Sequence, residues 1–360
     1  MIKLDYYGIR GAAKDWISNY LENRQQCVLF NNTISSLQTV TYGVPQGSIL
    51  GPLLFILYIN DIQNCSNFLY FILFADDTNV IASDPDWENL IKKLTAELQK
   101  LSEWFAINKL SLNIKKTNFM IFGSKRILNK NFKLIINREA LVEITSFKFL
   151  GIFIDSKLTW KNHINFISNK LARNIGIIKK LQNKLSGNSL ALLYNILVQP
   201  HLYYCTILWG GAYSSNLLYL QRLHKRALRL ITFSKFNAHA DPLFSRLKIL
   251  KIKDIYKLQI LTYIYKCKYN QIRNGLSNSE NCTFRNTHGY NTRNLLCMKI
   301  PFSKSNIRRF CIKHTGPALW NETNMYLHFD QLSSVDELKL SFTSILTKNY
   351  KLSSDMFSCH

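Results

Sequence analysis

The chain has 360 residues, of which 47% are hydrophobic and 13% are aromatic. That composition can bury real cores, so it excludes an intrinsically disordered protein, and the length favours more than one domain. Lys and Arg number 46 against 22 Asp and Glu, which gives a formal net charge of +24. Such an excess of positive charge favours a polyanionic partner, with nucleic acid ahead of anionic lipid or of a merely solvated basic surface.

The cysteines and the apolar segments bear on the cellular compartment. The eight cysteines are scattered without CxxC pairs, which favours free thiols and a reducing compartment. Residues 1–16 hold Asp5, Arg10 and Lys14 but no apolar stretch, so they do not read as a secretory signal. The longest apolar run, Leu192–Trp209, is interrupted by Gln, Pro and His, which argues against a membrane span. We expect an intracellular protein, nuclear or cytoplasmic, with no membrane partner.

Apolar spacing and turn residues predict mixed helices and strands in the first half of the chain. In chain order the predicted elements are a helix over 9–21, a hairpin over 27–42, an apolar helix over 53–62, strands over 68–74 and 78–82, a long helix over 87–105, and strands over 118–122, 132–136 and 147–154. The apolar helix over 53–62 has Pro52 before it and is expected to be buried. The two strands that follow it form a hairpin whose tip carries Asp76 and Asp77.

After Trp160 the pattern becomes helical. A basic amphipathic helix is predicted over 164–185, where Lys and Arg alternate with an apolar face. Further helices are predicted over 189–209, 216–231 and 241–267. Beyond Asn270 the sequence is polar and Asn-rich, which predicts a flexible segment over about 270–295. The fold class is therefore α+β in the first half, followed by helices.

Asp76 and Asp77 place two carboxylates next to one another at the tip of an apolar hairpin. Adjacent anions repel, and burying them without a partner is expensive, so a divalent metal is a natural explanation for keeping them there. The alternative is an ordinary solvated turn, because Asp is common in turns.

Motifs elsewhere in the chain strengthen the metal interpretation. The segment Gly43–Pro52 reads GVPQGSILGP, and Phe74–Thr78 reads FADDT. Further motifs follow in the same order: LNIKKT over 112–117, FLGIFID over 149–155 and LTWKNH over 158–163. Together they resemble the palm of reverse transcriptases from non-LTR (LINE-type) retrotransposons, and the resemblance extends over about residues 6–185. Weaker similarity continues over 192–209, 220–227 and 316–321.

The resemblance implies an RNA-directed DNA polymerase, which is a nucleotidyltransferase. Its partners would be an RNA template, a DNA primer and deoxynucleotides, and its cofactor would be Mg²⁺ in a two-metal site. Asp76 would be the main catalytic metal ligand, and Asp77 its neighbour with a lesser or shared role. The oligomeric state stays open.

Two further motifs supply candidate site residues by the same resemblance. Gln46, Gly47 and Ser48 match the loop that positions the template and the incoming nucleotide, although the loop also reads as a turn before a helix. Lys116 takes the basic position of the next motif, where a cation could neutralise or protonate the leaving phosphate. Its neighbour Lys115 makes this assignment ambiguous.

The resemblance also divides the chain. It implies a partial palm of the right-hand polymerase fold over 1–155, a helical thumb over 156–186, a helical basic region over 187–269, and a C-terminal region with a flexible start over 270–360. The basic helix of the thumb would follow the backbone of a duplex without reading its sequence.

One motif of the family has no counterpart in the sequence. The family pattern places the first catalytic aspartate on a strand upstream of Tyr7–Gly11, and Asp5, Asp15 and Glu22 do not match it. We therefore expect an N-terminally truncated polymerase with an incomplete metal site and little or no activity by itself. The alternative function is a non-catalytic nucleic-acid-binding remnant that uses the basic helices.

Other chemistry-bearing residues have plainer interpretations. The cysteines and histidines near the C-terminus lack the paired spacing of a structural zinc site, apart from Cys311 and His314. His224 is interpreted as part of a basic helical face rather than a catalytic base. Phe149 is expected in the core.

Overall fold

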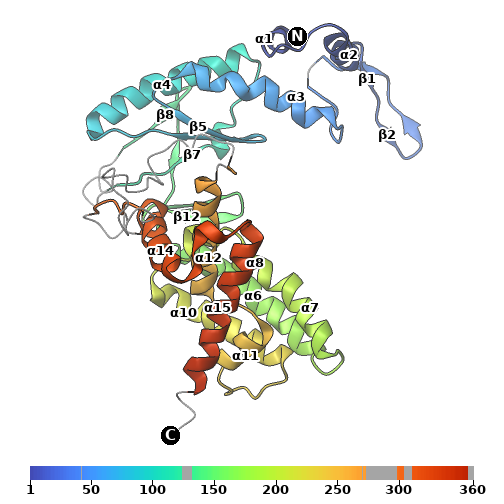
Figure 1. Cartoon of the computed structure of the whole chain (residues 1–360). Coiled ribbons are helices and arrows are strands. Elements are labelled where there is room, and N and C mark those ends of the chain that lie inside the picture. The colour runs from blue at the N-terminus through green and yellow to red at the C-terminus, as the bar shows by residue number, and fades with distance from the viewer. Residues whose placement is uncertain (42, 124–131, 270, 273–297, 304–309, 356–360) are drawn as a thin grey trace. The chain divides into compact units, whose positions relative to one another are not determined.

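The computed structural model describes residues 1–41, 43–123, 132–269, 271–272, 298–303 and 310–355. Two compact units divide the chain, the first spanning Met1–Ile144 and the second Thr145–His360 (Figure 1). Both contain helices and strands, which confirms the mixed class predicted from the sequence. The predicted end of the first domain, residue 155, falls within the second unit, because β12 (Ile152–Asp155) packs against the following helix α6 (Lys161–Leu181).

The first unit is built from helices and short strand pairs. Its helical elements are α1 (Ile2–Tyr6), α2 (Ala12–Leu21), α3 (Leu50–Ile59), η1 (Asn60–Cys65), α4 (Trp87–Ile107) and η2 (Ile114–Lys116). Its strands are β1 (Gln25–Gln26), β2 (Leu29–Phe30), β3 (Thr33–Ile34), β4 (Gln38–Thr39), β5 (Tyr70–Phe74), β6 (Asp77–Ile81), β7 (Asn118–Phe119), β8 (Ile135–Ile136), β9 (Glu139–Ala140) and β10 (Val142–Glu143). The described strands pair two by two, with β7–β10 parallel and β1–β4, β2–β3, β5–β6 and β8–β9 antiparallel.

The predicted hairpin over 27–42 is present as two nested strand pairs, which together form an arm. The pair β2–β3 lies at the end of this arm and the pair β1–β4 lies nearer its base. Asn31 and Asn32 form its turn with φ values of 47° and 60°. Positive φ at both turn residues suits the twist of a hairpin, and Asn tolerates it. The arm projects away from α2 (Figure 1), and Phe30 at its end is 71% exposed.

The long helix α4 contributes three buried side chains to the core of the first unit. Asp86 caps it by accepting a hydrogen bond from the Asn89 N–H at 3.0 Å. Leu98, Leu101 and Phe105 recur at helical spacing and are buried. The core they join consists of Ile59, Ile62, Leu98, Leu101, Phe105, Leu134, Ile136 and Leu141. The helix predicted over 87–105 is confirmed.

The burial predicted for the apolar helix over 53–62 is wrong. Within α3 only Gly51 and Ile59 are buried, and Leu53 and Ile56 are 53% and 54% exposed. The prediction assumed that a helix apolar on every side must lie in a core. In the first unit α3 packs chiefly against α1 and η1, and these short elements leave much of its surface open.

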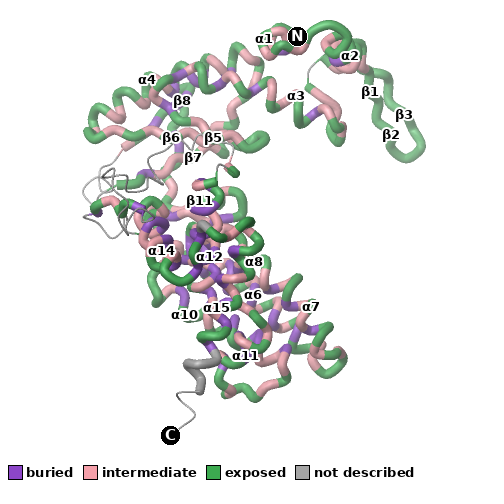
Figure 2. Tube along the Cα trace, viewed as in Figure 1, coloured by how far each residue is buried: buried purple, intermediate pink, exposed green. Residues whose placement is uncertain are grey.

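The second unit begins with a hairpin and continues as packed helices. Its described elements are β11 (Ser146–Phe149), β12, α6, α7 (Gly187–Leu197), α8 (Gln199–Tyr203), α9 (Thr206–Trp209), α10 (Ser214–Ile231), α11 (Asp241–Leu247), α12 (Ile252–Lys268), α14 (Ile312–Leu327), η4 (Phe329–Gln331) and α15 (Val335–Asp355). The buried positions gather on the facing sides of these helices (Figure 2). The largest fully buried side chains include Trp209, Trp320, Tyr194 and Tyr265. The helices predicted over 164–185 and 216–231 are confirmed as α6 and α10.

Two long helices predicted in the second unit are broken. The run over 189–209 forms α7, α8 and α9, because Pro200 in the first turn of α8 cannot continue a preceding helix and Cys205 has a left-handed φ of 48°. The run over 241–267 forms α11 and α12, which separate at Lys248, where φ is 53°. Apolar spacing misses such breaks because the side chains on both sides of each break enter the same core.

The strand predicted over 147–154 is a tight hairpin, β11–β12. Its turn lies at Leu150 and Gly151, whose φ values are 44° and 85°. A left-handed φ is costly for Leu. The Tyr204 hydroxyl donates to the Leu150 carbonyl oxygen at 2.6 Å, so the following helices hold the tip of this hairpin in place.

Candidate active site

The β5–β6 hairpin carries the two aspartates predicted to bind metal. Its last cross-strand pair joins Phe74 to Asp77, so Ala75 and Asp76 form a two-residue turn. Ala75 has a φ of 50°, and such tight hairpin turns require a positive φ. Asp76 therefore lies in the turn itself, and Asp77 is the first residue of β6. The predicted hairpin with an acidic tip is confirmed.

The base of this hairpin rests on the core of the first unit. Phe71, Leu73 and Val80 pack against the buried residues of that core. On the opposite face of β5, Ile72 and Phe74 are 36% and 57% exposed, since successive side chains of a strand point to opposite faces. The packed face ties the acidic tip to the core of the unit.

The carboxylates of Asp76 and Asp77 are both exposed. Neither accepts a hydrogen bond or an ion pair from another residue that the structure describes. Adjacent unpaired anions repel, and a divalent cation relieves that repulsion. Mg²⁺ in proteins is usually held by one or two carboxylates together with substrate phosphates, so this pair fits that ion. Within the described residues, no further His, Cys, Asp or Glu gathers with the pair into a group of three.

The glycine-rich segment before α3 forms a tight turn. Gly47 has a φ of 81°, and the Ser48 N–H donates to the Pro45 carbonyl oxygen at 3.3 Å, which places Gln46 at an exposed corner. The Ser48 hydroxyl donates to the same oxygen at 2.8 Å and accepts from the Gly51 N–H at 3.1 Å. Among the predicted substrate-binding residues, Gln46 and Gly47 face solvent, whereas the Ser48 hydroxyl holds the turn.

Lys116 ends the short helical turn η2 on the surface of the first unit. Asn113 organises that turn, since its side chain accepts from the Lys116 N–H at 3.2 Å and its carbonyl oxygen accepts from the Thr117 hydroxyl at 2.9 Å. Lys115 is exposed as well, so the turn does not favour one ammonium group over the other. No hydrogen bond or ion pair between described residues joins Lys116 to Asp76.

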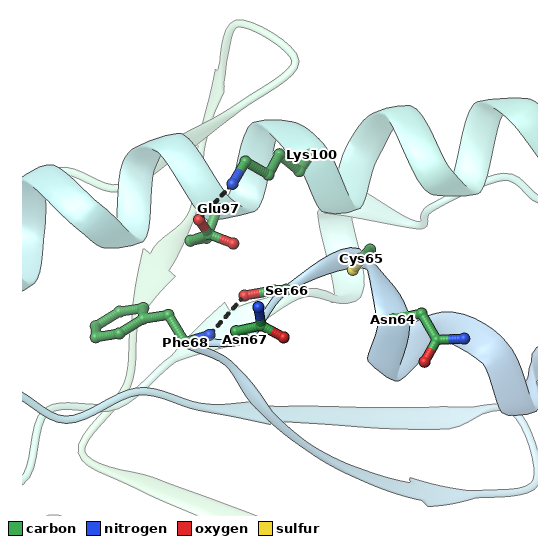
Figure 3. Close-up of a pocket in the computed structure, with 7 residues that line it drawn as sticks. All are labelled: Asn64, Cys65, Ser66, Asn67, Phe68, Glu97 and Lys100. Atoms are coloured by element: carbon green, nitrogen blue, oxygen red, sulfur yellow. Dashed lines mark hydrogen bonds and ion pairs between the residues drawn. The ribbon is translucent and has the colours of Figure 1, made fainter.

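A polar pocket lies where η1 ends beside α4 (Figure 3). It is lined by Asn64, Cys65, Ser66, Asn67, Phe68, Glu97 and Lys100. Glu97 is ion-paired with Lys100 at 2.7 Å. Burial raises the pKa of the Cys65 thiol, which is the opposite of what a nucleophile needs. None of the predicted site residues lines this pocket, so we assign it no part in the chemistry.

The interpretation of His224 as part of a basic helical face is wrong. Its side chain is 1% exposed, and its Nε2 lies 2.7 Å from the Tyr194 hydroxyl. Burial lowers the pKa of His224 to about 3, so the imidazole is neutral at physiological pH. One turn away on either side lie Leu220 and Leu228, which share the stripe of α10 that faces the core.

The cysteines and histidines near the C-terminus are only partly described. Cys311 and His314 lie one turn apart at the start of α14, where the His314 N–H donates to the Cys311 carbonyl oxygen at 2.9 Å. Cys282, His288 and Cys297 lie outside the described residues. The cysteines that the structure does describe are free thiols.

Basic side chains cover the outer surface of α6 in the second unit. Lys161, Arg173, Lys180 and Lys184 are exposed along or just after the helix. The apolar stripe on its other side, including Leu171, is buried. The sequence contains no Asp or Glu between residues 156 and 240, so this stretch carries positive charge without acids of its own.

Asp155 is a polar residue whose role sequence reasoning missed. It is 9% exposed, and its carboxylate accepts hydrogen bonds from the Thr159 N–H at 2.9 Å and the Trp160 N–H at 2.8 Å. It thereby shapes the turn that starts α6. The spacing of an Asp four residues before a Thr was the available signal, because Asp side chains commonly bond the backbone of following residues.

Comparison with known proteins supports the resemblance that the motifs indicate. A family model described as reverse transcriptase (RNA-dependent DNA polymerase) matches residues 3–154. A probable RNA-directed DNA polymerase from transposon X-element of Drosophila melanogaster is 28% identical over 245 residues, which cover 66% of this chain and 27% of that protein. The RNA-directed DNA polymerase from mobile element jockey of the same fly is 28% identical over 276 residues, which cover 72% of this chain and 29% of that protein.

Residues 3–154 thus carry a reverse transcriptase domain, and they include both the acidic hairpin and the glycine-rich turn. The relatives extend the match into the helices of the second unit. These matches support the resemblance to reverse transcriptases of the non-LTR retrotransposon type that the motifs predicted. It spans less than a third of the length of these curated relatives. Among the described residues, no helix is long and apolar enough to cross a membrane.

Proposed function

We propose that this chain acts in RNA-directed DNA synthesis, joining deoxynucleotides to a DNA primer on an RNA template. In that reaction the primer 3′ hydroxyl attacks the α-phosphate of the nucleotide, the bond to the β-phosphate breaks, and pyrophosphate leaves. The observation that carries the proposal is the exposed pair Asp76 and Asp77 at the tip of a packed hairpin, inside the segment that matches the polymerase family.

Asp76 and Asp77 would hold Mg²⁺, with Asp76 as the main ligand. When bound, the metal would lower the charge that builds up on the reacting phosphate and favour the alkoxide form of the primer hydroxyl. The two carboxylates contribute fixed negative charge on a rigid support, and their exposure leaves room for the phosphates of a nucleotide.

The glycine-rich turn would position the nucleotide and the template. Gln46 is exposed at the corner of the turn and can bond a base or a sugar. Gly47 lets the backbone approach a ligand closely, because no side chain stands in the way. Ser48 would contribute indirectly, because its hydroxyl stabilises the turn that carries Gln46 and Gly47. Lys116 would neutralise the leaving phosphate.

The remaining parts are assigned by the same proposal. Residues 1–155 would act as the palm, 156–186 as the thumb, and 187–269 as a helical basic region. The exposed cations of α6 would contact phosphates of the primer–template duplex, which gives affinity without sequence preference.

Mg²⁺-dependent extension of a DNA primer on an RNA template tests the proposal. Because little activity is expected of the chain by itself, the variants are compared in the fusion described below. There, Asp76→Asn should lower extension at least about a hundredfold, because it removes a charged metal ligand at nearly constant volume. Glu88→Gln is the matched control, since Glu88 is an exposed acid of the same unit outside the site. RNA binding by both variants should equal that of the unmodified chain. Equal loss of extension in both variants would remove Asp76 from the site.

A chimaera tests whether this chain by itself contains every residue that the site needs. The upstream part of the jockey polymerase would be fused before Met1, and the fusion compared with the chain alone. Extension only in the fusion, abolished by Asp76→Asn, means that the site needs a further ligand from outside these residues. Extension in neither would refute the proposed activity.

A further inference from the structure

The helix α10 has one face in the core and another in solvent. Its buried stripe includes Leu220, Leu223 and Leu228. The opposite side carries Tyr219, which is 52% exposed. Three exposed cations follow it on that side: Arg222, Lys225 and Arg226. Helical spacing of three and four residues brings these four side chains to a single surface, which we call the α10 basic face.

The cations of the α10 basic face are crowded. Arg222, Lys225 and Arg226 span about 6 Å along the helix axis at a rise of about 1.5 Å per residue. Like charges three and four residues apart destabilise a helix by themselves. None of the three forms a hydrogen bond or ion pair with a residue that the structure describes. Arg229, by contrast, is used internally and donates from Nε to the Ala238 carbonyl oxygen at 2.8 Å.

Neighbouring elements do not supply the missing negative charge. α10 packs against α6, α7 and α11. Of these three helices only α11 contains an acid, Asp241, and Lys251 already pairs with it at 2.9 Å. The acid-free stretch of sequence between residues 156 and 240 includes α6, α7 and α10 entirely. Within the described residues, the three helices that pack most closely against α10 therefore offer no unpaired acid to the α10 basic face.

We propose that the α10 basic face binds single-stranded nucleic acid, at a surface of the second unit distinct from the acidic hairpin. The clustered cations would neutralise consecutive phosphates. The exposed ring of Tyr219 would stack on an unpaired base, which distinguishes a single strand from a duplex whose bases are already stacked. Guanidinium groups such as those of Arg222 and Arg226 add contacts to phosphates or base faces.

An anionic membrane is the other polyanion that such charges could attract. A helix that lies on a bilayer inserts its apolar face among the lipids. In α10 that face is already buried in the core of the second unit, with Leu217, Leu220 and Leu228 each exposed by 1% or less. The surface that remains carries the three cations and Tyr219, with Leu218 as the one exposed aliphatic side chain of α10, which favours nucleic acid.

Binding of a fluorescent single-stranded RNA oligomer to the full chain, measured over a range of salt concentrations, tests this proposal. One variant combines Arg222→Gln, Lys225→Gln and Arg226→Gln. The matched control combines Lys248→Gln, Lys266→Gln and Lys348→Gln, which removes the same charge from scattered exposed positions of the second unit. Tyr219→Ala and Tyr219→Phe test stacking. Competition with duplex DNA and with phosphatidylserine vesicles tests the class of ligand.

We expect the α10 variant to bind RNA at least about tenfold more weakly, and its log–log salt slope to fall by about 2 because each lost phosphate contact removes about 0.7. The scattered control should change the slope by less than half as much. Tyr219→Ala should weaken binding roughly tenfold, and Tyr219→Phe should retain it. Equal losses in the two triple variants would show that net charge alone acts, and vesicles competing better than RNA would show a lipid surface. Either result overturns the proposal.

This inference does not depend on nucleotidyl transfer. Asp76→Asn should leave RNA binding and its salt slope unchanged. Loss of primer extension with normal RNA binding would concern only the acidic hairpin, and loss of RNA binding in the α10 variant would concern only this face. Circular dichroism and thermal unfolding check that each variant is folded, as expected for changes confined to exposed side chains.

Discussion

Replacing Asp155 by Ala tests what holds the turn between β12 and α6. The carboxylate of Asp155 accepts hydrogen bonds from the Thr159 N–H at 2.9 Å, the Thr159 hydroxyl at 3.1 Å and the Trp160 N–H at 2.8 Å. Leu158 and Trp160 in the same turn have left-handed φ values of 51° and 62°. Such conformations are costly for residues with side chains and persist only where their surroundings enforce them. Asp155 provides that enforcement.

The size of the effect follows from these contacts. A hydrogen bond to a charged group contributes about 1.5–3 kcal/mol, and bonds that share one acceptor do not add fully. We therefore expect Asp155→Ala to lower the free energy of unfolding by about 3 kcal/mol. Asp155→Asn keeps one acceptor oxygen but turns an amide NH₂ toward a backbone donor, so we expect about 2 kcal/mol.

Urea unfolding followed by tryptophan fluorescence gives the global effect, and hydrogen exchange of the Trp160 amide gives the local one. Lys157→Ala is the control, because Lys157 is an exposed residue of the same turn. It should change stability by less than about 0.5 kcal/mol. If Asp155→Ala costs no more than the control, or if the Trp160 amide stays equally protected, the carboxylate does not hold the turn.

Two further predictions concern the core of the second unit. A Cβ at Gly210 would lie 2.7 Å from both the Thr206 carbonyl oxygen and the Tyr256 Cβ, so Gly210→Ala should lower the midpoint of thermal unfolding and cost about 2 kcal/mol or more. Gly176→Ala, where a Cβ meets nothing within 4 Å, should instead be neutral or stabilising. Burial lowers the pKa of His163 to about 4 and that of His224 to about 3, both from 6.5. The unfolded chain therefore binds more protons between pH 4 and 6.5, and the free energy of unfolding should decrease as the pH is lowered through that window, by up to about 1.4 kcal/mol per unit for each histidine. Urea titrations at several pH values should show a flatter dependence for His224→Gln, and an unchanged dependence would contradict the assignment.

The acidic hairpin is a feature that the local sequence was enough to predict. Two β-prone runs around an Ala-Asp-Asp sequence were enough to predict the hairpin and the position of Asp76, because strand propensity and turn chemistry act over a few residues. The hydrogen bonds by which the Ser48 hydroxyl holds the glycine-rich turn could not be predicted from the sequence. Its partners, Pro45 and Gly51, depend on how the turn meets α3. A motif identifies a residue type, and only the folded turn shows which of its atoms remain available.

By itself the sequence determined the resemblance to reverse transcriptases, the acidic hairpin and the amphipathic helices α4, α6 and α10, because each of these depends on residues near one another in the chain. Tertiary structure alone decided the exposure of α3 and the burial of His224. These features depend on which surfaces meet. The periodicity of a sequence shows that one face of a helix is apolar, whereas packing decides whether another element covers that face. His224 is buried because its hydrogen-bonding partner, Tyr194, lies on a different helix of the same core.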